Sequence, residues 1–154
     1  MEDPKNKIID INLSVTEKKQ FRIDGDDNRI IELNTSDLSI LSRIQNCYPR
    51  LDALSMKATD LSSDSEENEE NAERIVTVLS EIDAEMREIL DFVFDSKIAD
   101  ICAPSGTMFD MFNGEFRFEH IMNTLIPLYE NNIDAEYKLM AKRIKKRTSK
   151  YTGK

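Results

Sequence analysis

The apolar residues of this chain change their spacing at Asn34–Asp37, and this change constrains the fold more than any other feature. Before it, apolar side chains alternate with polar ones, as in Ile9–Val15 and around Phe21 and Ile23. Such alternation is typical of half-buried strands. After it, apolar side chains recur every three or four residues, which is the spacing of one helix face. The sequence therefore predicts an α+β fold, in which a small N-terminal antiparallel β-sheet packs on a mostly α-helical body.

The sheet is expected within residues 8–34. The cluster Asp24–Asn28 is rich in turn-forming residues, and Ile31 and Leu33 resume the alternation beyond it. These runs predict a β-hairpin, and the alternation over residues 9–15 predicts one more strand before it. Two or three strands are not stable alone in water, so we expect them to pack against the helices.

A first helix is expected over residues 36–60. Thr35 or Ser36 is the predicted N-cap, and Pro49 is expected to kink the helix or to end it. Residues 61–73 follow, and they are serine-rich and acidic with almost nothing to bury. A segment of this composition favours a mobile loop between helices.

Residues 74–148 are expected to form the main helical portion, and residues 149–154 a basic tail. The length of 154 residues suits one domain and is short for two. The helical portion is expected to hold, in order, a long helix through Ile75–Val93, a short helix through Ile98 and Ile101, an aromatic loop, a kinked helix around Pro127, a break at Asn131–Asn132 and a last helix from Asp134.

Two surfaces are candidates for binding a partner. The first is a stretch of large apolar side chains around Asn113-Gly114, because Met and Phe side chains adapt to varied partners. The alternative is that these side chains fill the core between helices. The residues assigned to this candidate surface are Met108, Phe109, Met111, Phe112, Phe116 and Phe118.

The second candidate is the basic C-terminus. The chain has a formal net charge of -9, yet from Lys138 onward every charged side chain is basic. This segregation favours electrostatic contact with an acidic partner. The alternatives are a solvated helix end and phosphate contact with nucleic acid. The residues assigned here are Lys142, Arg143, Lys145, Lys146 and Arg147.

No catalytic or metal site is predicted, and no cofactor is expected. His120 is the single histidine, and no serine or cysteine lies in a recognisable nucleophile motif. Four isolated glycines form no phosphate-binding loop. Asp24–Asn28 matches the start of a calcium-binding loop, but the sixth position is Arg29 where glycine is required. We therefore expect a protein that is not an enzyme and that acts by binding.

The expected location is the cytoplasm. Cys47 and Cys102 lie within apolar segments, as reduced thiols do. No apolar run is long enough to cross a bilayer, and no membrane partner is expected. The first residues lack the apolar core of a signal peptide.

Several segments resemble small proteins of tailed phages and prophages of Gram-positive bacteria. In particular, the chain is similar to the tail assembly chaperones of long-tailed phages. The resemblance covers most of the chain, except the acidic insert around Ser62 to Asn71. The segments that carry it are Ile11–Val15, Phe21–Asp26, Phe94–Gly106, Phe112–His120 and Arg147–Tyr151.

The resemblance implies a non-enzymatic protein of the bacterial host cytoplasm. Members of the family bind the tape measure protein, keep its long apolar helices soluble and help recruit tail tube subunits to it. They leave before the virion matures. Two alternatives stay open: a minor tail component that remains in the particle, and a small nucleic-acid-binding regulator that uses the basic C-terminus. A homo-oligomer is possible in each case.

Overall fold

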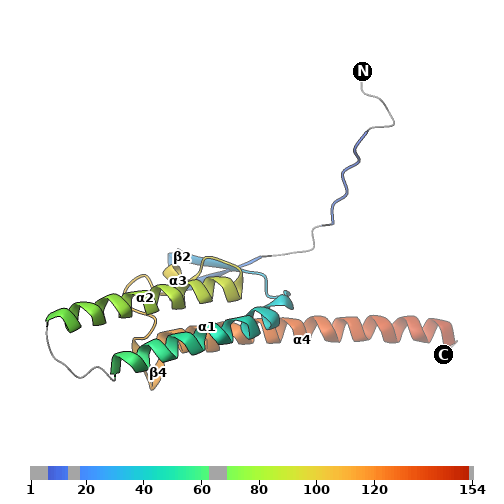
Figure 1. Cartoon of the computed structure of the whole chain (residues 1–154). Helices are drawn as coiled ribbons and strands as arrows, with labels where there is room; N and C mark the ends of the chain where they lie inside the picture. The colour runs from blue at the N-terminus through green and yellow to red at the C-terminus, as the bar shows by residue number, and fades with distance from the viewer. Residues whose placement is uncertain (1–6, 14–17, 63–68, 153–154) are drawn as a thin grey trace.

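A computed structural model describes the backbone of residues 7–13, 18–62 and 69–152, and their side chains except at Ser62 and 147–152. A small hairpin and two long helices gather around one half of a third long helix, whose other half projects from the body (Figure 1). The predicted α+β class is confirmed. In chain order the elements are β1 (Lys19–Ile23), β2 (Asp26–Leu33), α1 (Ser39–Ser62), α2 (Glu69–Phe94), α3 (Ala99–Cys102), β3 (Met111–Phe112), β4 (Glu115–Phe116) and α4 (Arg117–Thr152).

The N-terminal sheet is the antiparallel pair of β1 and β2, in which Phe21 faces Ile31. Asp24 and Gly25 form its two-residue turn, and both have positive φ. Positive φ at both positions gives the backbone twist that suits a tight hairpin. The predicted hairpin is therefore confirmed, and it ends just before Asn34.

The strand predicted over residues 9–15 is wrong for the part that the structure describes. Residues 7–13 lie in no strand, and Ile9 and Ile11 are 78% and 74% exposed. A strand needs a neighbouring backbone to complete its hydrogen bonds. Among the described residues, β1 and β2 pair only with each other, so the alternating pattern alone does not produce a third strand.

The first helix, α1, starts at Ser39 because Asp37 caps it. The Ser39 backbone N–H donates a hydrogen bond to the Asp37 carboxylate over 2.9 Å, as an N-cap requires. The predicted cap at Thr35 or Ser36 is therefore wrong, and Thr35 is buried. The helix also continues through Pro49 and does not end there.

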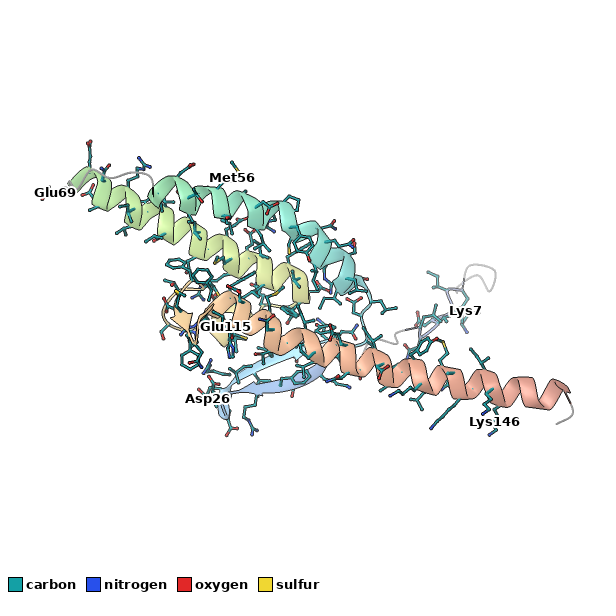
Figure 2. All side chains as sticks on the ribbon, turned by 90° about the horizontal axis from the view of Figure 1, so that it is seen from below. Lys7, Asp26, Met56, Glu69, Glu115 and Lys146 are labelled. Atoms are coloured by element: carbon teal, nitrogen blue, oxygen red, sulfur yellow. The ribbon has the colours of Figure 1, made fainter. Side chains whose placement is uncertain are left out.

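The second helix, α2, runs antiparallel beside α1, as both views show (Figures 1 and 2). Arg50 of α1 ties the pair together through contacts of 2.8 Å to Glu85 and 3.3 Å to Glu88. The start of α2 at Glu69 shortens the loop that was predicted over residues 61–73. Acidic residues suit the first turn of a helix because its N-terminus carries partial positive charge. Residues 63–68 lie outside the described part of the chain.

The last helix, α4, is continuous from Arg117 to Thr152, so the predicted break at Asn131–Asn132 is wrong. The asparagines cost less than about 1 kcal/mol each in a helix. Asn132 also bonds to the body: its amide donates to Ser36 over 2.9 Å and accepts from Lys19 over 3.0 Å. The helix includes residues 149–152, which were predicted as a tail.

Beyond Ile133, α4 leaves the body. Every described side chain from Asp134 to Lys146 is exposed, and Figure 2 shows this half of the helix extending away from the other elements. The residues before it supply one side of the core. The core side chains are Ile31, Leu33, Ile40, Cys47, Leu54, Ile82, Ile89, Leu90, Val93, Phe94, Ile98, Ala99, Ala103, Met108, Phe118, Ile121, Leu125 and Tyr129.

Candidate functional site

The segment that leads into the aromatic stretch is held against α2 by Arg87. Its guanidinium contacts Asp83 at 3.0 Å and Asp100 at 2.9 Å, and donates to the carbonyls of Ala103 at 2.8 Å and Gly106 at 3.1 Å. Burial alone would lower the pKa of Arg87, but the two carboxylates outweigh it and raise the pKa. A largely buried charge with this many partners fixes the backbone around it.

A second set of bonds fixes the next residues. The Met108 backbone N–H donates to the Asp83 carboxylate over 2.7 Å, and the Phe118 N–H donates to the Met108 carbonyl over 2.8 Å. The Arg117 N–H donates to the Asp110 carbonyl over 2.8 Å. The start of the aromatic stretch is therefore anchored to α2, and its two ends are anchored to each other.

Between these anchors the chain forms a second hairpin, β3–β4. Its turn is Asn113-Gly114, and both residues have positive φ, the conformation that Asn-Gly turns favour. On its outer side, Glu115 contacts His120 at 2.7 Å. The ring centroids of Phe112 and His120 are 6.5 Å apart in an edge-on arrangement. The hairpin lies on the surface of the body, and its contacts with His120 connect it to the first turn of α4.

An apolar groove of about 530 Å³ opens between α1, α2 and this hairpin. The elements bring together side chains that are far apart in sequence, and its walls are almost entirely hydrocarbon. A concave, preformed apolar surface is the usual shape of a binding site. Its lining residues are Leu51, Leu54, Ser55, Ala58, Thr59, Leu79, Ile82, Met86, Phe109 and Phe116.

The six predicted aromatic-stretch residues divide into two groups. Met108 and Phe118 are only 0% and 7% exposed, so they belong to the core and present no surface to a partner in this structure. The other four keep exposed area, and two of them, Phe109 and Phe116, line the groove. Met111 and Phe112 lie outside it and are largely exposed.

The predicted basic residues lie elsewhere on the molecule. Lys142, Arg143, Lys145 and Lys146 are exposed on the projecting half of α4, while Arg147 is within the helix but its side chain lies outside the described part. From the rise per residue, this segment is roughly 40 Å along the axis from the start of α4. Figure 2 shows Glu115 and Lys146 well separated along α4. The two candidate surfaces therefore do not form one site.

The groove walls on α1 and α2 were not assigned from the sequence. Leu51 and Leu54, like Ile82 and Met86, follow the helical spacing that predicts core residues. Spacing identifies the face of a helix that packs, but it cannot show that the packing leaves a groove open. One signal in the sequence could have indicated the groove. It is a pair of successive amphipathic helices, followed by an Asn-Gly turn between aromatic residues.

The two cysteines and the aspartates of the first hairpin turn were also candidates for chemistry, and the structure accounts for each of them. Burial raises the pKa of the Cys102 thiol to about 11 and also raises the pKa of Cys47, which disfavours the reactive thiolate. Asp24 and Asp27, in the turn compared with a calcium loop, pair with Arg29 and Arg22. Among the described residues, no cluster of three or more His, Cys, Asp or Glu side chains could hold a metal ion.

Comparison with known proteins gives no relative: no family model, no curated protein and no solved structure matches the chain. Within the described ranges, none of the helices has the length and apolarity that a membrane span requires.

Proposed function

We propose that this protein is a non-enzymatic assembly chaperone that binds an apolar face of a partner helix in the groove between α1, α2 and the β3–β4 hairpin. The observation that carries the proposal is the groove itself, which is about 530 Å³ in volume and apolar. Amphipathic helices bind in such grooves by inserting side chains that recur every three or four residues.

The walls of the groove suit a partner of variable sequence. Met86 is an unbranched, adaptable side chain, and Phe109 and Phe116 supply large flat surfaces. The bonds from Asp83 and Arg87 to the segment before the hairpin hold the aromatic wall in place. A preorganised wall loses little conformational entropy when a partner binds.

The resemblance to tail assembly chaperones supports a specific partner, the tape measure protein. A tape measure protein presents long apolar helices before the tail is built, and a chaperone that covers them in the host cytoplasm keeps them from aggregating. Recruitment of tail tube subunits and departure before maturation belong to the same proposal. No cofactor takes part.

Co-expression with the tape measure protein of the same genome tests the proposal. We expect a soluble complex, and we expect Phe116→Ser to weaken it by about tenfold or more because Phe116 lines the groove. Phe112→Ser is the matched control, since Phe112 is exposed on the paired strand but lies outside the groove. Thermal melts of both variants verify folding.

Three results would contradict the proposal. Failure of the wild-type chain to bind the tape measure protein would reject the partner. Stoichiometric retention of the chain in purified particles, measured by mass spectrometry, would favour a minor tail component. Binding to DNA with a steep salt dependence, together with no effect of Phe116→Ser on any partner, would favour a nucleic-acid-binding regulator.

A further inference from the structure

The face of α4 that packs on the body continues along the projecting half of the helix. Tyr129 is 2% exposed and Ile133 is half-buried, whereas Tyr137 and Met140 on the same face are 64% and 51% exposed. Ile144 follows at helical spacing and is 58% exposed. Lys138 lies roughly 160° around the helix from Met140, on the opposite face. The projecting half is therefore an amphipathic helix, and its apolar face is exposed because no other element packs on it.

Charge divides the molecule into two ends. The segment from Asp60 to Glu73 contains no basic residue, and the segment from Lys138 to Lys154 contains no acidic residue. The acids of the first segment are Asp60, Asp64, Glu66, Glu67, Glu69, Glu70 and Glu73. The basic residues of the second are Lys138, Lys142, Arg143, Lys145, Lys146, Arg147, Lys150 and Lys154.

The two charged ends point away from each other. The free ends of α1 and α2, which carry the described acids Asp60, Glu69, Glu70 and Glu73, are at one end of the molecule, and the projecting half of α4 is at the other (Figures 1 and 2). Figure 2 places Glu69 and Lys146 at these opposite ends. A single straight helix cannot fold back to the acidic end of its own chain, but it can reach the acidic end of a second copy.

The dimensions of the two surfaces also agree. The groove borders α2 from Met86 to Leu79, and α2 then continues to Glu69 at the acidic end. At about 1.5 Å per residue, Glu69–Met86 and Ile133–Thr152 each span roughly 25–30 Å. A helix laid along α2 with its apolar face in the groove would place its basic end over Glu69, Glu70 and Glu73 at the start of α2.

We infer that the chain associates head to tail with a second copy, with the projecting half of α4 from one copy in the α1–α2 groove of the next. Apolar burial of Tyr137 and Met140 drives the contact, and the opposed charges orient it. The contact is heterologous, so every linear assembly retains one open groove and one open helix, at its two ends, until a ring closes.

This self-association occupies the same groove as the proposed client, but it does not depend on that client. A second copy and an amphipathic client helix compete for one apolar surface. The helix of a second copy therefore covers the groove when the client is absent. Purified protein alone is enough to test this.

Sedimentation equilibrium of the full chain provides the first test. We expect the average mass to rise with protein concentration at low salt and to fall as salt screens the opposed charges. Met140→Asp should weaken association by about tenfold or more, because it places a charge in the apolar contact. Lys138→Gln changes the net charge equally on the opposite face, where Lys138 is exposed, and should retain most of the association.

Mixing two defective variants provides the second test. Ala58→Lys blocks the groove and leaves α4 intact, while Met140→Asp leaves the groove intact and disables α4. Each variant alone should be monomeric, and an equimolar mixture should form a 1:1 dimer that grows no further. Ala53→Lys is the control on the same helix, because Ala53 is exposed but does not line the groove.

Three outcomes would overturn the inference. They are a monomeric wild-type chain at every concentration at low salt, equal effects of Met140→Asp and Lys138→Gln, and failure of Ala58→Lys and Met140→Asp to complement each other. The client experiment is distinguishable from these, since Met140→Asp leaves the groove open and should still bind the tape measure protein. Loss of client binding with intact self-association would reject only the proposed function.

Discussion

The backbone N–H of Met108 donates a hydrogen bond of 2.7 Å to the carboxylate of Asp83, which links the residue before Phe109 to the middle of α2. The other carboxylate oxygen of Asp83 contacts Arg87 at 3.0 Å. One acidic side chain therefore positions both the aromatic wall of the groove and the guanidinium that fixes the preceding loop.

Arg87→Met should lower the free energy of unfolding by about 3 kcal/mol, because it leaves Asp83 without its cationic partner in a mostly buried site. For a chain of this size the melting temperature should fall by about 6–12 °C. Arg22→Met is the control, since its pair with Asp27 is exposed and should contribute less than about 1 kcal/mol. Equal falls in the melting temperatures of the two variants would show that the contacts of Arg87 add no more stability than an exposed ion pair.

Gly106→Ala should be more destabilising than Gly114→Ala, although both glycines have positive φ. At Gly114 an added Cβ meets nothing, so only the backbone preference is lost, about 1 kcal/mol. At Gly106 the Cβ would displace the ends of the Asp110 and Arg117 side chains, and disturbing their hydrogen bonds to Thr107 and Ser105 adds about 0.5–1.5 kcal/mol. Denaturant unfolding of the two variants measures the difference, and similar midpoints would contradict it.

Asp37→Asn should destabilise the protein at neutral pH and not in acid. Burial would raise the pKa of Asp37, but hydrogen bonds from Ser39 and the charge of Arg43 outweigh it and lower the pKa below 3.8. The ionised group thus adds stability above pH 3.8, and this contribution disappears as the pH falls through the lowered pKa.

Asn retains the N-cap hydrogen bond that Asp37 makes, so the variant isolates the charge. The expected loss at pH 7 is about 1–3 kcal/mol, the usual range for a hydrogen bond to a charged group. Unfolding free energies of both proteins between pH 2 and pH 7 provide the measurement. A difference that stays constant over this range would show that the charge of Asp37 makes no contribution.

Truncation after Ala141 should leave the melting temperature nearly unchanged, because the described side chains beyond it are exposed. The same truncation should slow association with an acidic surface most at low salt, where the Debye length is long. Ile121→Ala in the packed half of α4 is the contrast, with an expected loss of about 2–5 kcal/mol. A large fall in melting temperature on truncation would show that the basic end packs on the body.

The local periodicity of the sequence determined the fold class and most of the elements. The spacing from Ile75 to Val93 specified α2, and the turn residues Asp24-Gly25 specified the first hairpin, because both are local properties of the chain. The break predicted at Asn131–Asn132 is wrong because the continuity of α4 depends on tertiary contacts. Packing of Tyr129 and the bonds of Asn132 keep the helix continuous, and neither can be read from neighbouring residues.

The sequence also determined that Met108–Phe118 and the basic C-terminus are the unusual segments, since composition and charge are visible in the chain itself. Only the tertiary structure decided which of these side chains face outward. Burial depends on which elements meet, so Met108 and Phe118 enter the core while Phe109 and Phe116 border a groove. The same dependence places Lys146 at the end of a projecting helix, far from the aromatic hairpin that follows Asp110.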